Sequence, residues 1–257
     1  MIFVGMGVVM RIALTIAAAA LCAGCVTTES VQFQPQAGQQ AIIRDGSPGL
    51  VSERKNSLVI ARPAARQLQI GGRPVFVIAI YNRTNVPQNF LISNVQVTQI
   101  VNGEAVPLKV ITYEQLVEEE HTRQVFVAVA TGLAAGANAY SASRAGYYNS
   151  NSTVYTPHGA YMVNTTGYSP TAAAIAQSNA SAQNSEMISA VIERGQANLT
   201  TLERSVIKDD TVMPGEWCGG QLHIQPLAGD SHMKTYTIVV QVGSDRHEIS
   251  VAQGNPA

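Results

Sequence analysis

The sequence predicts an α+β protein in which an antiparallel β-sandwich is interrupted by a long antiparallel helical hairpin. Short runs rich in β-branched and aromatic residues lie on both sides of a central region, and that region has helical periodicity. Strands before and after a helical insertion are typical of one sandwich. We therefore expect a β-sandwich formed by 51–112 plus 211–257 and a hairpin over 113–210, following a leader at 1–24 and a polar segment at 25–50.

The first group of predicted strands consists of six short runs, at 57–62, 66–70, 75–81, 89–92, 95–101 and 105–111. Asn102-Gly103 joins the last two and supplies the positive-φ residues of a type I′ turn. Both faces of the run 75–81 are apolar, which predicts a central strand covered on both sides.

A helix is predicted to begin after Thr112, because Thr112 and Gln115 have capping-box spacing and glutamates follow near the positive end of the helix dipole. It extends to about Arg144. A second helix begins at Ser169-Pro170, a favourable N-cap and first residue, and extends to about Lys208.

The contact between the helices is predicted from apolar residues at a spacing of three and four. On the first helix this seam consists of Val125, Ala128, Gly132, Ala135, Ala139 and Ala142. On the second it consists of Ala174, Ser178, Ser181, Ser185, Ile188, Ile192, Leu199, Leu202 and Val206. Small residues would meet near the tip and allow a close approach of the backbones.

Strands return at 216–225, 233–242 and 246–251, separated by Pro214-Gly215, Gly229-Asp230 and Gly243-Ser244. With the segments FVIAIYNRTNVPQNF early and PGEWCGG late, the arrangement resembles the immunoglobulin-like sandwiches of bacterial envelope lipoproteins. The resemblance covers about 100 residues, concerns architecture alone and identifies no site.

The N-terminal sequence MRIALTIAAAALCAGC, from Met10 to Cys25, has an arginine, ten apolar residues and the small pair Ala23-Gly24 before a cysteine. It resembles a bacterial lipoprotein signal. That resemblance implies cleavage before Cys25 and acyl chains on Cys25. Residues 1–9 are apolar and add no charge, so we expect Met10 to be the true start in place of Met1. An uncleaved membrane anchor over 2–24 is the alternative, although Arg11 near its middle is costly in a membrane.

In the Gram-negative lipoproteins that this signal resembles, an Asp directly after the lipidated cysteine favours the inner membrane. This chain has Val26 at that position. The resemblance therefore implies an outer-membrane lipid anchor facing the periplasm, with the inner membrane as the alternative. From Val26 to about Gln40 the chain is polar, and we expect a tether between lipid and domain within 25–50.

Composition limits the partners. Charged residues make up 13% of the chain, apolar residues 46%, and the net charge is −1, so nucleic-acid binding is not expected. Of three cysteines, Cys22 leaves with the leader and Cys25 carries lipid, which leaves Cys218 without a disulfide partner in the mature chain.

The predicted hairpin has almost no charge. From Gln124 to Ser185, Arg144 is the one fully charged residue among 62. A membrane-spanning hairpin is one interpretation, but it is opposed by the many Asn, Gln and Ser residues. Self-association of hairpins, or contact with another envelope protein, explains the low charge without burial in lipid.

The expected tip, at 145–169, contains five of the nine tyrosines, Tyr147, Tyr148, Tyr155, Tyr161 and Tyr168. Tyrosine mixed with Asn, Ser and Gly resembles the composition of binding loops, so the five form a candidate contact surface. Alternatively the rings pack the turn onto the helix ends. A small hairpin around Pro157-His158-Gly159 is expected there.

Catalytic chemistry is not expected. Cys218 and His223 lie in one predicted strand with opposite parity, so a cysteine-dependent hydrolase is a weak alternative. The five histidines show no metal-ligand spacing, and no cofactor motif is present. We expect a lipid-anchored structural or accessory protein of the cell envelope that is not an enzyme and holds no metal or cofactor. A module that binds glycan or peptidoglycan through its tip is the second possibility.

Overall fold

The computed structural model describes residues 28–44, 46–101, 103–227 and 233–254. Its contacts divide the chain into two compact units. The β domain comprises the described residues up to Ile111 and from Ile207 onward, and the hairpin unit comprises Thr112–Val206. The predicted leader and Cys25 lie outside the described residues.

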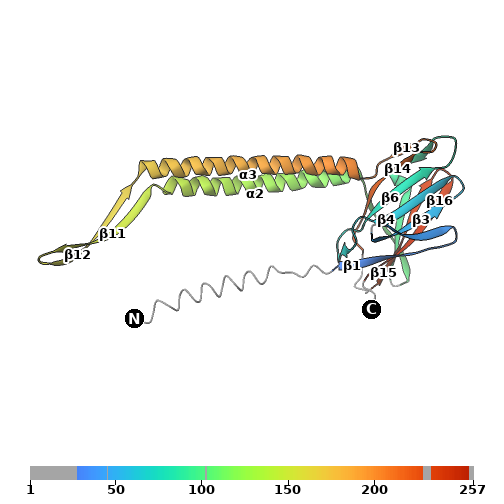
Figure 1. Cartoon of the computed structure of the whole chain (residues 1–257), viewed down its shortest axis with the longest axis horizontal. Helices are drawn as coiled ribbons and strands as arrows, with labels where there is room; N and C mark the ends of the chain where they lie inside the picture. Colours follow the sequence, from blue (N-terminus) through green and yellow to red (C-terminus); the bar gives the residue numbers. More distant parts are fainter. Residues whose placement is uncertain (1–27, 45, 102, 228–232, 255–257) are drawn as a thin grey trace. The chain divides into compact units, whose positions relative to one another are not determined.

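Two antiparallel six-stranded sheets build the β domain (Figure 1). The first has the order β5 (Leu68–Gln69), β1 (Thr28–Gln34), β16 (Asp245–Gly254), β15 (Met233–Val242), β8 (Val95–Val101) and β9 (Glu104–Leu108). The second has the order β10 (Val110–Ile111), β14 (Trp217–Ile224), β6 (Val75–Asn82), β4 (Ser57–Pro63), β3 (Ser47–Glu53) and β2 (Gln39–Arg44). A short pair, β7 (Gln88–Phe90) with β13 (Asp210–Val212), and the 3-10 turn η1 (Ile92–Asn94) complete the domain.

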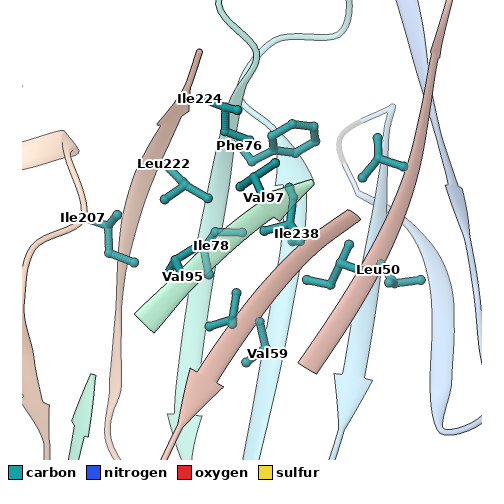
Figure 2. Close-up of a cluster of buried hydrophobic side chains, with 14 of the residues drawn as sticks. Leu50, Val59, Phe76, Ile78, Val95, Val97, Ile207, Leu222, Ile224 and Ile238 are labelled. Atoms are coloured by element: carbon teal, nitrogen blue, oxygen red, sulfur yellow. The ribbon is translucent and has the colours of Figure 1, made fainter. Parts of the chain in front are cut away.

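Buried side chains from both sheets form one core. Figure 2 shows Phe76 and Ile78 of β6 lying near Val97 of β8 and Ile238 of β15. The Phe76 ring lies edge-on to Tyr236, with 6.0 Å between the ring centroids. The expected α+β class with antiparallel sheets is confirmed at this level.

The central position predicted for β6 is confirmed, since β6 lies between β14 and β4. Its two faces differ, however, because residues alternate between fully buried and half-buried along the strand. The second face is therefore only partly covered. β8 and β9 pair with Val101 opposite Glu104, and Gly103 has a φ of 86°, while Asn102 of the predicted turn lies outside the described residues.

The tether expected within 25–50 is wrong from Thr28 onward, because β1, β2 and the first part of β3 occupy this segment. β1 pairs with β16 from Ser30 to Gln34, and Val31 is buried in the core. Only one face of β1 contributes to the core, so its other residues can be polar and the apolar periodicity is weak. β2 and β3 then form a hairpin that joins the second sheet.

Two long helices form most of the hairpin unit, α2 (Tyr113–Arg144) and α3 (Pro170–Ser205), and they lie side by side along their length (Figure 1). The predicted capping box of Thr112 and Gln115 is present, and so are the Ser169 N-cap and Pro170 in the first turn. Between the helices the chain forms a two-stranded ribbon of β11 (Tyr147–Thr156) and β12 (Gly159–Tyr168). The expected small hairpin is thus present and is longer than predicted.

Candidate interaction surfaces of the hairpin unit

The first polar layer between α2 and α3 is built around Glu120, which is buried. Its carboxylate accepts hydrogen bonds from Arg123 at 2.6 and 2.7 Å, from Gln124 at 3.0 Å and from Asn198 of α3 at 3.3 Å. Chiefly because of the Arg123 hydrogen bonds, the pKa of Glu120 is lowered to about 2. Gln124 also donates to the carbonyl oxygen of Gly195.

A second polar layer lies nearer the ribbon. The Asn138 amide donates to the Asn184 side-chain oxygen at 3.1 Å, and the Asn184 amide donates to the carbonyl oxygen of Ala135 at 3.1 Å. Partly buried amides that satisfy each other favour one axial register between two helices, because sliding would leave them unpaired. The two layers therefore set the alignment of α2 against α3.

The predicted seam on α2 is wrong except at Ala135 and at Ala142, which is buried. The less exposed residues of this helix, from Glu120 to its end, are Glu120, Gln124, Val127, Thr131, Ala135, Asn138 and Ala142. Val125, Ala128, Gly132 and Ala139 are exposed instead. Most of the predicted α3 seam is wrong for the same reason, including Ile188 and Ile192, although Leu199, Leu202 and Val206 are at least partly covered. Polar pairs occupy the contact between α2 and α3. A prediction based on the spacing of apolar residues therefore selected another face of each helix.

The outer stripe of α2, formed by Phe126, Val129, Leu133, Gly136 and Tyr140, is an exposed apolar face of this unit. Phe126 and Leu133 are 71% and 73% exposed, and Val129 and Tyr140 are also exposed. The spacing of three and four residues is that of a heptad repeat. Leu133 follows the contact residue Gln124 by nine residues, or two and a half turns, so the stripe lies opposite α3. This repeat was present in the sequence and could have revealed the stripe.

Two exposed isoleucines of α3 lie at the same position along the axis of the helical hairpin as part of the outer stripe. Leu133 precedes Asn138 by five residues, and Ile188 follows Asn184 by four, so the hydrogen-bonded asparagines place Leu133 and Ile188 within about 2 Å of the same height. Both isoleucines, Ile188 and Ile192, are about half exposed. A methyl group at Gly132 or Gly136 would have nothing within 4 Å, so this side of α2 is open to a second helix.

By length and composition, α2 is also long and apolar enough to cross a membrane. Its most apolar stretch of 18 residues has a mean hydropathy of 1.4, and 6% of that stretch is buried. It is the one such helix among the described residues.

The five tyrosines of the candidate contact surface fall into two groups. At the helix end of the ribbon, Tyr147 and Tyr168 pack together with 5.0 Å between ring centroids, and the Tyr148 ring lies over Gly167, where a methyl group would come within 2.5 Å of it. At the turn, Tyr155 is 82% exposed and Tyr161 is 56% exposed. The three rings at the helix end pack locally but remain at least half exposed, with Tyr147 at 70%. The packing interpretation therefore fits them in part, and the contact surface stays a prediction for all five tyrosines.

The side chains that could take part in catalysis, which include Cys218 and His223, lie in the β domain. Cys218 packs against the core, and burial, with a smaller contribution from Asp210, raises the pKa of its thiol to about 11. Its strand alternates so that Cys218 and His223 face opposite sides. No group of three or more His, Cys, Asp or Glu side chains suited to a metal ion is found in the part of the chain that the structure describes.

A buried Ser–His–Asp cluster was missed by sequence reasoning because its members are far apart in the chain. Ser57 Oγ lies 2.8 Å from His247 Nε2, and it donates to Asp245 at 2.9 Å, while His247 Nδ1 contacts Ser52 Oγ at 3.0 Å. Asp245 bonds the serine and not the imidazole, and Ser52, Ser57 and His247 have no exposed surface. A nucleophile needs access to substrate, so this cluster joins β3, β4 and β16 and supports no catalysis.

Comparison with known proteins gives no match to a protein-family profile, a curated protein or a solved structure. Cys25 cannot be placed, since it lies outside the described residues. The candidate sites that the described residues provide are therefore the outer stripe of α2 and the tyrosine-bearing ribbon.

Proposed function

We propose that this chain is a lipid-anchored structural or accessory protein of the bacterial cell envelope, which assembles with further copies of itself through the hairpin unit. The observation that carries the proposal is the outer stripe, a heptad of exposed apolar side chains opposite the helix's own partner. Exposed apolar surface of this extent is typical of an interaction site.

A second copy fits the stripe better than a charged partner. The stripe lies in an uncharged segment from Gln124 to Ser143, so two copies would bring no like charges together. Each copy also presents Ile188 and Ile192 at the height of its own Val129 and Leu133, and these side chains would give a neighbouring stripe apolar contacts. Another envelope protein that covers the stripe is the alternative.

The anchor rests on the resemblance of residues 10–25 to a lipoprotein signal, which favours the outer membrane and a periplasmic domain. Because β1 begins at Thr28, the chain from an acylated Cys25 could extend only about 10 Å before it enters the sheet. The β domain would then be held against the membrane surface. We also propose that the β domain is an immunoglobulin-like sandwich, which its two antiparallel sheets support.

Co-purification of two differently tagged, full-length copies from one cell tests the assembly. We expect the copies to co-purify, Leu133→Glu to abolish co-purification, and Ala134→Glu to preserve it. Ala134 is the matched control because it is exposed on the same helix but lies about 100° away from Leu133. Failure of wild-type copies to co-purify, or equal effects of both substitutions, would contradict self-assembly through the stripe.

A further inference from the structure

The two faces of the β11–β12 ribbon differ in chemistry. Residues opposite each other in an antiparallel pair share a face, and Tyr147 opposite Tyr168 fixes the register. The amide face carries Tyr147, Asn149, Asn151, Thr153, Tyr155, Ala160, Met162, Asn164, Thr166 and Tyr168. The valine face carries Tyr148, Ser150, Ser152, Val154, Thr156, Gly159, Tyr161, Val163, Thr165 and Gly167. All three asparagines of these strands therefore lie on one face.

The ribbon also has the dimensions of a membrane-crossing hairpin. Each strand has 10 residues, and neither contains a charged residue. At about 3.4 Å per residue, such a strand is roughly 34 Å long and rises roughly 24 Å at a 45° tilt. The apolar band of an outer-membrane barrel is about 25 Å tall.

Tyrosines mark both ends of the ribbon. Tyr147, Tyr148 and Tyr168 lie at the helix end, and Tyr155 and Tyr161 lie at the turn, with no tyrosine between. Tyr148 and Tyr161, one at each end, lie on the valine face. In barrels of this kind, aromatic girdles at the two membrane–water interfaces flank the lipid-facing apolar band. The valine face, which has no amide, would suit lipid, and the amide face would suit a water-filled interior.

The ribbon lacks the support that an isolated hairpin needs in water. Every residue of β11 is exposed, and in β12 only Gly167 is partly covered. Two strands alone are marginally stable, and in a bilayer their outer edges must be paired. Further copies of the same ribbon can pair with both edges.

We propose that the β11–β12 ribbons of several copies join edge to edge into a membrane-spanning β-barrel, with the valine face against lipid and the amide face inward. This inference rests on the self-assembly and lipid anchor proposed above. Since such barrels have at least about eight strands, at least four copies are required.

Neighbouring positions at mid-strand, Val163 and Asn164, test the inference. In full-length protein with Cys218→Ser, a polarity-sensitive fluorophore is attached to Val163→Cys or Asn164→Cys, and the protein is reconstituted into phosphatidylethanolamine–phosphatidylglycerol vesicles. We expect spin-labelled lipid to quench the label at position 163 and aqueous iodide to quench the label at position 164. Quenching of both by iodide and of neither by lipid would overturn the inference.

A charge at the same positions gives a second readout. Val163→Arg should lower the membrane-inserted fraction about 30-fold or more, whereas Asn164→Arg should leave it nearly unchanged, because only the first places a charge against lipid. Equal behaviour of the two variants would contradict the assigned faces.

Tagged-copy co-purification from the same preparations separates the two proposals. Copies that associate while both labels stay in water would overturn only the barrel, and copies that do not associate would overturn both proposals. If Tyr155→Ala with Tyr161→Ala removed binding to isolated sacculi while both labels stayed in water, the ribbon would be a glycan-binding element and the barrel would be excluded.

Discussion

Lys234 Nζ lies 2.9 Å from Glu29 Oε1, and both side chains are buried in the β domain. Gln253 donates its amide to the other Glu29 oxygen at 2.7 Å, and Tyr236 Oη donates to Gln253 Oε1 at 3.0 Å. The network joins β1 to β15 and β16 only four residues after Cys25. A force applied to an acylated Cys25 would therefore be transmitted directly to this sheet.

Breaking this ion pair should destabilise the β domain. Lys234→Met leaves the Glu29 carboxylate buried without its cation, which should lower the free energy of unfolding by about 3–5 kcal/mol. Denaturant unfolding followed by the fluorescence of Trp217, the single tryptophan, measures this. The exposed Lys55→Met serves as control and should change stability by less than about 0.5 kcal/mol. Similar small losses for both variants would show that the pair does not hold β1 in place.

The stability of the β domain should fall in mild acid because of His247. Burial lowers the pKa of His247 from 6.5 to about 4. Above pH 6.5 the imidazole is neutral in both states, and between pH 6.5 and 4 only the unfolded state binds the proton. Stability is therefore complete above about pH 6.5 and decreases by about 3 kcal/mol as the pH falls toward 4.

The comparison that isolates this effect is wild type against His247→Gln, unfolded by denaturant at several pH values. The difference between the two proteins should shrink as the pH falls, because the variant lacks the titrating imidazole. Parallel pH profiles would mean that His247 keeps its ordinary pKa in the folded domain.

Loss of the asparagine layer should weaken the contact between α2 and α3. Asn184→Ala leaves the Asn138 amide without its acceptor at a half-buried position, at a cost of about 1–3 kcal/mol. Thermal unfolding followed by helical ellipticity measures the loss. Ser185→Ala, at the next and exposed position, is the control and should change little. An equal effect of the two substitutions would argue against a register set by this layer.

Lipidation at Cys25 has a direct chemical test. Mass spectrometry of the mature protein should find Cys25 as the N-terminal residue carrying acyl chains, and Cys25→Ser should release the protein from the membrane fraction. Detection of an intact segment 10–24 on the mature chain would instead support the uncleaved anchor.

Local rules predicted the limits of the helices because their determinants are local. Thr112 with Gln115, and Ser169 with Pro170, act within one turn and do not depend on tertiary contacts. The strands after Ser57 were also predictable, since alternation there follows the burial of one face.

The remaining features depend on partners that are distant in the sequence. The strand β1 was taken for a tether because Glu29 is polar and is buried only through Lys234 and Gln253, more than 200 residues away. The helix seam was misplaced because Glu120 and Asn138 occupy it, and their partners Asn198 and Asn184 cannot be identified by hydrophobic periodicity. Of the candidate site, the five tyrosines could be selected from composition, but the ring contact between Tyr147 and Tyr168 could not.

The absolute mass of the full-length protein, extracted in mild detergent and measured by light scattering on a sizing column, tests self-assembly most directly. We expect a defined oligomer for wild type and for Ala134→Glu, and a monomer for Leu133→Glu. Four or more copies would also satisfy the barrel, whereas a dimer would support assembly and exclude the barrel. A monomeric wild-type protein would contradict the account, and the outer stripe of α2 would then belong to a different partner.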